Sequence, residues 1–250
     1  MNFLGVIPAR YGSTRFPGKP LAMLAGKPLI QWVYESASGI LEDVVVATDD
    51  KRIVDAVMEF GGEVVMTDYE HRSGTDRCSE ASRIMEMEGY SSDVVINIQG
   101  DEPFTSKKQV DLLMNAFTDP SVEIATLAGP VQNKEDLFDP NVVKVVITQD
   151  GNALYFSRST LPFLQHEEKD NWFGKFKFLH HLGVYAYRYK ILQEITRISQ
   201  SPLEMAESLE QNRWLENGRK IRVCITDEVN LGIDTPEDLA RAEKIVADRK

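Results

Sequence analysis

Apolar segments of strand length alternate with helix-like segments through residues 1–100, and this pattern constrains the fold more than any other feature. Strands are predicted at 3–7, 44–48, 64–67 and 94–98, with helices at 28–38, 49–61 and 75–88 between them. Continuously apolar strands separated by helices are typical of a parallel sheet covered on both faces and wound right-handed. We therefore expect an α/β fold with a Rossmann-like mixed, mainly parallel sheet, helices on both faces, and ligands outside the carboxyl ends of the strands.

The pattern changes after about residue 120. Strand-like segments at 142–148 and 153–157 flank an Asp-Gly turn, which predicts a hairpin, and 179–187 predicts a further strand. A small antiparallel annex is therefore expected within one domain over 1–250. The later segments predict a helix at 203–217, a strand at 221–225 and a helix at 236–247, whereas the polar stretch 165–175 predicts a surface loop.

Charge is unevenly distributed along an acidic chain. The chain has 39 Asp and Glu against 28 Lys and Arg, a net charge of −11. The only charged side chains in residues 1–34, however, are the cations Arg10, Arg15, Lys19 and Lys27. Global acidity argues against nucleic acid as a partner, because non-specific nucleic-acid binding needs a basic face. The local excess of cations instead points to a small anionic ligand.

The remaining composition indicates a protein in the cytoplasm. No apolar run approaches the roughly 18 residues of a membrane span, and the first residues lack the basic region of a signal peptide. We therefore expect no membrane partner. The only two cysteines, Cys78 and Cys224, are predicted to be reduced core thiols.

The segment 8–20, PARYGSTRFPGKP, follows the first predicted strand directly. It combines guanidinium groups (Arg10, Arg15), an ammonium (Lys19) and a hydroxyl (Ser13) with glycines whose backbone amides can turn toward a ligand. These are the donors of a polyphosphate site, although the segment is neither a Walker A sequence nor GxGxxG. A solvated basic loop is the alternative, but three prolines stiffen the segment.

Two carboxylates follow in positions suited to Mg²⁺. Asp101, in QGDEP, comes after the strand 94–98, where it either holds a metal against phosphate oxygens or shapes a turn. In GIDTPED, Thr235 and Asp238 form a predicted helix-capping pair, which leaves Asp234 available as a second metal ligand. Two carboxylates and a cationic loop on one sheet suggest metal-assisted phosphoryl chemistry.

These motifs also resemble a known family over residues 3–246. The opening loop, SGTDR at 73–77, QGDEP at 99–103, NVVKVV at 141–146, YFSR at 155–158, HHLGVYAYR at 180–188, SPLE and LEQ at 201–211, and GIDTPEDL at 232–239 resemble CMP-Kdo synthetases. This family is also called 3-deoxy-manno-octulosonate cytidylyltransferase, and Kdo is its sugar acid. The resemblance is specific because eight ordered motifs agree.

The resemblance implies a role for each matching residue. It assigns the CTP phosphates to Arg10, Ser13, Arg15 and Lys19, with Ser73, Thr75 and Arg77 near the cytidine; helix capping is the competing role for Ser73 and Thr75. It assigns Mg²⁺ to Asp101 and Asp234, and with them Arg10, Arg15 and Lys19 make up the expected catalytic set. It assigns the sugar acid to Gln99, Arg158, His181, Glu210 and Gln211. The alternatives are a turn for Gln99, surface pairing for Arg158, a strand histidine for His181, and a solvated helix face or dimer contacts for the last two.

The implied activity is transfer of CMP from CTP to the anomeric hydroxyl of Kdo, an activation step in lipopolysaccharide biosynthesis. The resemblance also implies a homodimer, with a sub-region at about 130–215 for sugar binding and dimerisation. The alternatives are a cytidylyltransferase for 8-amino-Kdo or sialic acid, a sugar-1-phosphate nucleotidyltransferase, a nucleotide-sugar glycosyltransferase, and a nucleotide sensor without turnover. The sequence does not distinguish Kdo from its close relatives.

Overall fold

The computed structural model describes residues 1–12, 16–228 and 232–248. The chain forms two compact units, and each is described by itself. The first holds the described residues of 1–110, 186–196 and 232–248, and the second holds 111–185 and 197–228. The predicted sub-region at 130–215 falls mostly in the second unit; its role, and the expected single domain, stay predictions.

The first unit is built on parallel strands in the order β5-β4-β1-β6. Its elements, in chain order, are β1 (Phe3–Ala9), the 3₁₀ turn η1 (Lys19–Leu21), β2 (Met23–Leu24), β3 (Lys27–Pro28), α1 (Leu29–Ser38), β4 (Asp43–Thr48), α2 (Lys51–Glu59), β5 (Val64–Met66), α3 (Gly74–Met87), β6 (Val94–Asn97), α6 (Tyr189–Ile195) and α9 (Pro236–Asp248). The helix α4 (Lys107–Ala116) begins in this unit and ends in the other.

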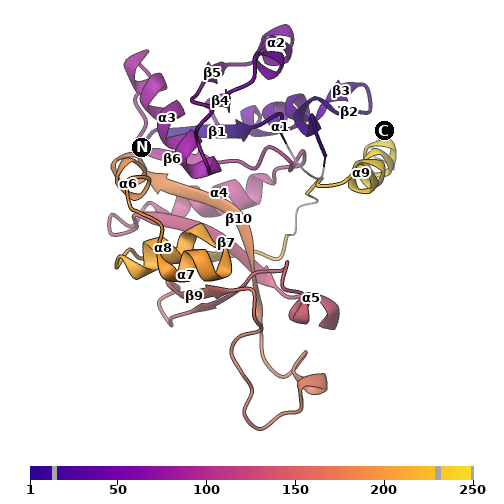
Figure 1. Ribbon diagram of the computed structural model, residues 1–250, viewed down its shortest axis with the longest axis vertical. Coiled ribbons are helices and arrows are strands. Elements are labelled where there is room, and N and C mark those ends of the chain that lie inside the picture. The colour runs from indigo at the N-terminus through magenta and orange to yellow at the C-terminus, as the bar shows by residue number, and fades with distance from the viewer. Residues whose placement is uncertain (13–15, 229–231, 249–250) are drawn as a thin grey trace. The chain divides into compact units, whose positions relative to one another are not determined.

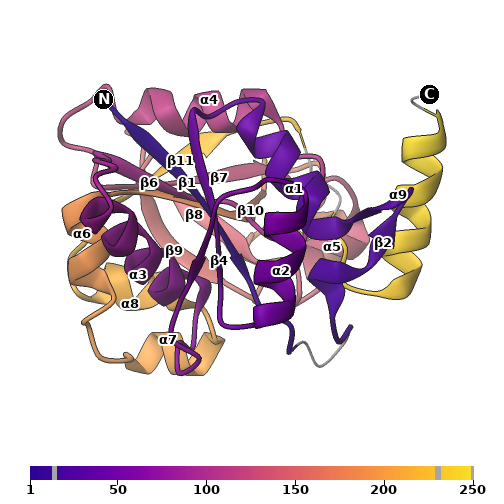
Figure 2. The ribbon, with the colours of Figure 1, turned by 90° about the horizontal axis from the view of Figure 1, so that it is seen from above.

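Helices cover both faces of these strands. The chain moves outward from β1 through α1 to β4 and through α2 to β5, then returns through α3 to β6 on the other side of β1. Right-handed crossovers therefore place α1 and α2 on one face and α3 on the other. Figure 2 shows this arrangement, with β1 and β4 between the two sets of helices.

The strand registers bring four carboxyl ends to one edge. Ala9 lies beside Thr48, and Thr48 lies beside Met66. Asn97, the last residue of β6, pairs with Val6, three residues before Ala9. The residues that follow these strands therefore share this edge of the sheet. The predicted strands and helices of residues 1–100 are confirmed here, with ends that differ by one or two residues.

A separate apolar cluster holds α9 in the first unit. Leu24 and Leu29 pack with Ile233, Ala242 and Val246, and the partly buried Trp32 and Phe104 lie against them. In Figure 2, α9 lies beside β2. This packing brings the segment before α9 toward the loop that opens the chain.

The second unit contains mixed strands. Its elements are β7 (Ile124–Pro130), α5 (Lys134–Phe138), β8 (Lys144–Ile147), β9 (Ala153–Ser157), the 3₁₀ turn η2 (Lys169–Asn171), the first part of β10 (Leu179–Arg188), α7 (Pro202–Glu207), α8 (Glu210–Glu216) and β11 (Ile221–Ile225). β11 is parallel to β7, whereas β8 is antiparallel to both β9 and β10. The predicted hairpin is confirmed as β8 and β9. In the first unit, β2 and β3 form a separate two-stranded antiparallel sheet.

The prediction of one helix over 203–217 is wrong. The segment forms α7 and α8, because Ser208 adopts the left-handed conformation with φ 52° and Leu209 is extended. The break buries Leu209 to 7% exposure. Figure 1 shows the two short helices side by side in the second unit.

The predicted surface loop at 165–175 is mostly exposed but contains one buried anchor. Trp172 is 2% exposed and packs with Val131, Leu137 and Phe178. Neither Cys78 nor Cys224 is in a disulfide, as predicted; Cys78 is buried and Cys224 is half-buried. None of the helices in the described ranges has the length and apolarity to cross a membrane.

Candidate functional site

Lys19 lies between the two predicted metal carboxylates in the first unit. Its Nζ donates to Asp101 Oδ2 at 2.8 Å and to Asp234 Oδ1 at 3.1 Å. Distances of 2.8 and 3.1 Å to one nitrogen place those two oxygens no more than 5.9 Å apart. Side chains that are 82 and 215 residues from Lys19 in the sequence therefore meet at one point.

Local structure presents each of these three side chains. Gly18, in the left-handed conformation with φ 72°, precedes η1, and its N–H donates to Tyr11 O at 2.9 Å. The backbone of Asp101 accepts from Ile233 N at 2.9 Å, which joins the segment after β6 to the segment before α9. This last bond is between backbone groups, so it holds the two segments together without using the side chain of Asp101.

The predicted capping pair leaves Asp234 for this contact. Asp238 N donates to Thr235 Oγ1 at 3.2 Å, and Thr235 N donates to Asp238 Oδ2 at 2.9 Å, which is the reciprocal capping box. Asp234 N also donates to Asp238 Oδ2 at 3.0 Å. Asp238 thus carries the helix terminus, and the Asp234 side chain is directed to Lys19.

The donor chemistry of the pair fits Mg²⁺. Mg²⁺ is bound in proteins by one or two carboxylates, with water and substrate phosphates completing its coordination. Asp101 and Asp234 supply two carboxylates at one point, and in the described residues no group of three His, Cys, Asp or Glu side chains could hold a metal by itself. Two carboxylates are consistent with a Mg²⁺ site that also needs phosphate oxygens. The Mg²⁺ site stays a prediction.

The other predicted phosphate ligands are placed in part. Arg10 follows β1 directly and is exposed. Ser13 and Arg15 lie outside the described residues. Arg52, at the start of α2, stacks over the Tyr11 ring with its guanidinium carbon 3.2 Å from the ring centre, so the opening loop is held on α2 next to Arg10.

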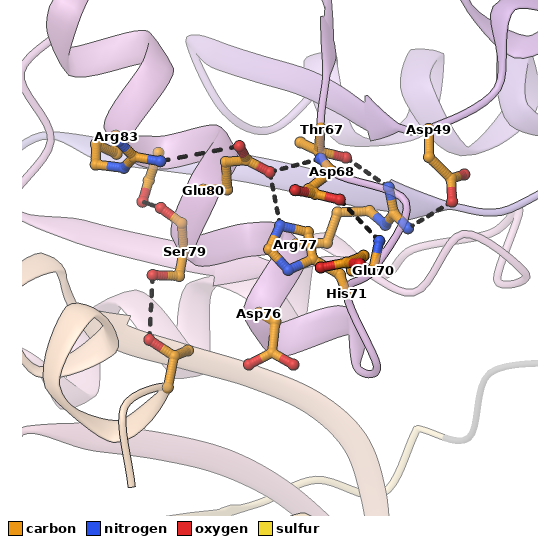
Figure 3. A network of polar contacts seen from close by, with 12 residues as sticks. Asp49, Thr67, Asp68, Glu70, His71, Asp76, Arg77, Ser79, Glu80 and Arg83 are labelled. Atoms are coloured by element: carbon orange, nitrogen blue, oxygen red, sulfur yellow. Dashed lines mark hydrogen bonds and ion pairs between the residues drawn. The ribbon is translucent and has the colours of Figure 1, made fainter.

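The segment 73–77, predicted to lie near the cytidine, makes contacts within the protein that stabilise the fold (Figure 3). Ser73 caps α3 by accepting from Asp76 N at 3.1 Å, so its capping role is confirmed. Thr75 is buried. Arg77 is 1% exposed; its Nη2 donates to Asp49 Oδ2 at 3.1 Å and its Nη1 donates to the Thr67 hydroxyl.

Asp49 and Thr67 are partners of Arg77 that the sequence did not reveal. Asp49 follows β4 and Thr67 follows β5, so Arg77 ties two strand ends to the first turn of α3. The nearest sequence signal was an ordinary helix start at Asp49 and Asp50. Long-range pairing of a buried Arg has no local signature, and this is why it was missed.

A second polar cluster holds the segment between β5 and α3 (Figure 3). Glu80 Oε2 accepts from Asp68 N at 2.7 Å and lies 2.6 Å from His71 Nε2. Burial raises the pKa of Glu80, but these partners more than offset it, so the pKa lies below its ordinary value. Glu80 is therefore a charged anchor for the segment that leads to Ser73.

Among the predicted sugar-acid residues, Gln99 belongs to the first unit and Arg158 to the second. Gln99 lies two residues after the end of β6 at Asn97 and is half-buried. Arg158 is half-buried after β9; its Nε donates to Glu207 O at 2.7 Å and its Nη1 to Pro140 O at 3.0 Å. Arg158 is thus held by backbone carbonyls of the second unit.

His181 is placed among aromatic rings of the second unit. Its ring centre lies 4.9 Å from that of Phe156 and 5.3 Å from that of Tyr185, and its Nε2 lies 3.0 Å from Thr126 Oγ1. Burial lowers the pKa of His181 to about 3, with a smaller contribution from His180. His181 is therefore a neutral hydrogen-bonding group at physiological pH.

Glu210 and Gln211 begin α8 in the same unit. Glu210 Oε1 accepts from Arg213 Nη2 at 2.6 Å, and Gln211 is 6% exposed. Trp214, on the same helix, packs edge-on to Tyr185 with ring centres 5.3 Å apart. The α8 helix is therefore adjacent to the rings that surround His181, while the sugar-binding roles of these residues stay predictions.

Comparison with known proteins identifies the family. Residues 4–221 match a family model described as cytidylyltransferase. A curated relative from Parabacteroides distasonis, 53% identical over all of both chains, is a 3-deoxy-manno-octulosonate cytidylyltransferase, and so is one from Bacteroides thetaiotaomicron, 54% identical over all of both chains. The chain belongs to this cytidylyltransferase family. The resemblance seen in the sequence is confirmed.

Solved structures agree with this family and with the fold. The structure of a CMP:2-keto-3-deoxy-manno-octonic acid synthetase complexed with CTP is 40% identical, matches all of both chains, and has a TM-score of 0.90. A glucose-1-phosphate thymidylyltransferase from Bacillus anthracis, 18% identical with a TM-score of 0.64 over 98% of this chain and 96% of that one, shares the fold alone. The predicted α/β nucleotidyltransferase fold is confirmed.

Proposed function

We propose that this cytidylyltransferase transfers CMP from CTP to the anomeric hydroxyl of Kdo, giving CMP-Kdo and pyrophosphate. The structural observation that carries the proposal is the meeting of Lys19, Asp101 and Asp234 beside the opening loop. The substrate class is supported by the curated relatives at 53 and 54% identity over the whole chain. The product would serve lipopolysaccharide biosynthesis.

The bonds exchanged define what the residues must do. The sugar hydroxyl oxygen forms a bond to the α-phosphorus, the bond from that phosphorus to the β-phosphate oxygen breaks, and the hydroxyl proton is released. No protein nucleophile is needed. The enzyme has to bring the two substrates into line and stabilise charge that develops on the pyrophosphate.

Lys19 and Arg10 supply positive charge for that purpose. Arg10 is exposed just after the end of β1, and the Lys19 ammonium lies 2.8 and 3.1 Å from the two carboxylates, from which a bound phosphate would draw it. Arg15 is proposed for the same role from the sequence. Fixed cations stabilise a developing oxyanion because they need no rearrangement at the moment of reaction.

Asp101 and Asp234 would hold Mg²⁺ when CTP is bound. A bound Mg²⁺ supplies Lewis-acid chemistry at phosphate and hydroxyl oxygens. The two carboxylates are half-buried, with 29 and 41% of their side chains exposed, so they are accessible to an ion that keeps part of its water.

The sugar acid is proposed to bind Gln99, Arg158, His181, Glu210 and Gln211. Its carboxylate suits the planar fork of Arg158. Neutral His181 suits a sugar hydroxyl, since its ring can donate and accept hydrogen bonds. We further propose that the protein is a homodimer and that it lies in the cytoplasm. Light scattering coupled to size-exclusion chromatography would test the homodimer.

One assay tests the activity and its alternatives. Pyrophosphate release is measured with Mg²⁺, each of the four NTPs, and a panel of Kdo, 8-amino-Kdo, sialic acid and sugar 1-phosphates. We expect pyrophosphate release only from the pair of CTP and Kdo. Release with sialic acid or a sugar 1-phosphate in preference to Kdo would support the alternative, and no release with CTP and Kdo would refute the proposal.

A variant tests the metal assignment. Asp101→Asn keeps the size of the side chain but removes its charge, so CTP binding should persist while turnover falls by roughly 10²-fold or more. The matched control is Asp55→Asn, which alters only the exposed Lys51–Asp55 pair on α2. Near-normal turnover of Asp101→Asn would remove Asp101 from the metal site.

A further inference from the structure

Glu207, the last residue of α7, directs its carboxylate at the end of strand β9. Oε2 accepts from the backbone N–H of Arg158 at 2.9 Å. Oε1 accepts from the hydroxyls of Ser157 at 2.6 Å and Tyr155 at 3.3 Å. One carboxylate therefore collects three donors from a single short stretch of the second unit.

The backbone of the same residue holds the Arg158 side chain. The carbonyl of Glu207 accepts from Arg158 Nε at 2.7 Å, while Arg158 Nη1 donates to Pro140 O at 3.0 Å. A planar guanidinium bound at two points has a fixed orientation. Glu207 thus sets both the backbone position and the side-chain direction of Arg158.

Local energetics oppose a carboxylate at this position. The carboxyl end of a helix carries partial negative charge, which disfavours Glu there. Ser208, the next residue, adopts the left-handed conformation with φ 52°, which costs free energy for a residue other than glycine. The contacts that Glu207 makes with β9 offset the unfavourable charge, while bonds from Ser208 N and Leu209 N to Glu204 O accompany the left-handed turn.

The carboxylate is charged in the folded protein. Burial raises the pKa of Glu207, but the Ser157 hydroxyl and the Arg158 N–H more than offset it, and the pKa lies below its ordinary value. Charge-assisted hydrogen bonds are shorter and stronger than neutral ones. The charged carboxylate is therefore the stronger acceptor for the donors of β9.

We propose that Glu207 is a positioning residue, which orients the Arg158 guanidinium toward the carboxylate of the sugar-acid acceptor. The inference rests on the proposed function, because it takes that acceptor as the ligand of Arg158. It adds a residue to the site that neither the motifs nor the family resemblance assigned. Its effect is specific: sugar-acid binding depends on Glu207 through Arg158, whereas CTP binding does not.

The test compares the Michaelis constants of the two substrates. Glu207→Gln keeps the shape of the side chain and removes its charge, and Glu207→Ala removes the carboxylate. We expect the KM for Kdo to rise ~3-fold in the first variant and ~10-fold or more in the second, with the KM for CTP within about twofold of the parent. Tyr155→Phe is the matched control, because it removes a donor to the same carboxylate without touching Arg158.

A double-mutant cycle separates positioning from general stability. If Glu207 acts through Arg158, then Glu207→Ala should change Kdo binding little once Arg158→Ala is present; titration calorimetry measures this binding directly. Independent effects that multiply, or equal rises in the KM of both substrates, would overturn the proposal. Absence of turnover by the parent enzyme with CTP and Kdo would instead refute the proposed function, so the two failures are distinguishable.

Discussion

The ammonium of Lys19 lies 2.8 Å from the carboxylate of Asp101, at the position where a divalent cation would be expected. Asp234, which is 3.1 Å from the same nitrogen, completes a cationic bridge between two carboxylates. Lys19 therefore balances part of the negative charge of the two carboxylates that we propose as metal ligands. A phosphate that attracts the ammonium would leave both carboxylates to a metal.

Replacing Lys19 should change ion binding and turnover in opposite directions. In Lys19→Met the two carboxylates lose their cationic neighbour, so Mg²⁺ should bind the nucleotide-free enzyme more tightly, by roughly tenfold or ~1.4 kcal/mol. Turnover should fall by roughly 10²-fold, because a fixed positive charge near the phosphates is lost. Calorimetric titration with Mg²⁺ and the pyrophosphate assay measure the two effects.

The matched control is Lys27→Met. Lys27 pairs with the single carboxylate of Glu35 on the surface of the same unit, at 2.6 Å. The Lys27→Met variant should have the Mg²⁺ affinity and the turnover of the parent. Weaker Mg²⁺ binding by Lys19→Met would contradict the idea that Lys19 competes with the ion.

Arg77 is expected to act on stability rather than on nucleotide contact. Arg77→Met leaves the carboxylate of Asp49 and the hydroxyl of Thr67 without their buried partner, and breaking a buried pair costs about 3 kcal/mol. Urea denaturation measures the loss. Arg83→Met, on the exposed side of the same helix, is the control and should cost less than ~1 kcal/mol. An unchanged free energy of unfolding with weakened CTP binding would instead restore Arg77 to the nucleotide site.

Much of the first unit could be predicted from its sequence because its signals are local. Continuous apolar runs marked β1, β4, β5 and β6, and the Thr-Pro-Glu-Asp segment marked the start of α9. Asp101 could be placed in the site because parallel strands bring the residues after them to one edge. In each case the deciding residues lie within a few positions of one another.

The features that were missed depend on distant partners. Nothing near Arg77 shows that it pairs with Asp49, and nothing near Ser208 shows a left-handed break in a helical pattern. Glu207 likewise looks like a solvated helix residue until β9 is folded against it. Sequence periodicity reports which face of an element is apolar, but it does not report which polar groups meet across elements.

Asp238 should make stability depend on acid. Burial raises the pKa of Asp238, but Arg241, Thr235 and two backbone N–H groups more than offset it and lower the pKa from 3.8 to about 2. Because the folded-state pKa is depressed, the stabilisation is complete above the unfolded value of 3.8 and is lost as pH falls toward about 2. Thermal unfolding between pH 6 and 2 should show this loss.

The variant Asp238→Asn isolates the contribution. It should cost about 1 kcal/mol near neutral pH, the usual value of a helix cap, and should flatten the acid limb of the stability curve. Glu237→Gln, an exposed neighbour in the same turn, is the control. If both variants follow the parent curve, Asp238 does not carry the pH dependence.

His181 should remain neutral, in one tautomer, throughout the physiological range. Thr126 has a single hydroxyl hydrogen, which its 2.8 Å bond to Val184 O takes. We therefore expect the Thr126 oxygen to accept from His181 Nε2–H at 3.0 Å, which leaves Nδ1 as the acceptor that we propose for a sugar hydroxyl. Since burial lowers the pKa of His181 to about 3, no proton should be gained between pH 8 and pH 5.

Nitrogen-15 spectra of the histidine rings measure both properties. The His181 signals should show a protonated Nε2, an unprotonated Nδ1 and no titration from pH 8 to 5, while Thr126→Val should remove the preference for this tautomer. The pH profile of kcat/KM for Kdo should accordingly contain no ionisation of His181. The profiles of the parent and of a His181→Asn variant should therefore have the same shape. Titration of His181 near 6.5, the ordinary histidine value, would mean that the ring is solvated and that its proposed role as a fixed acceptor is wrong.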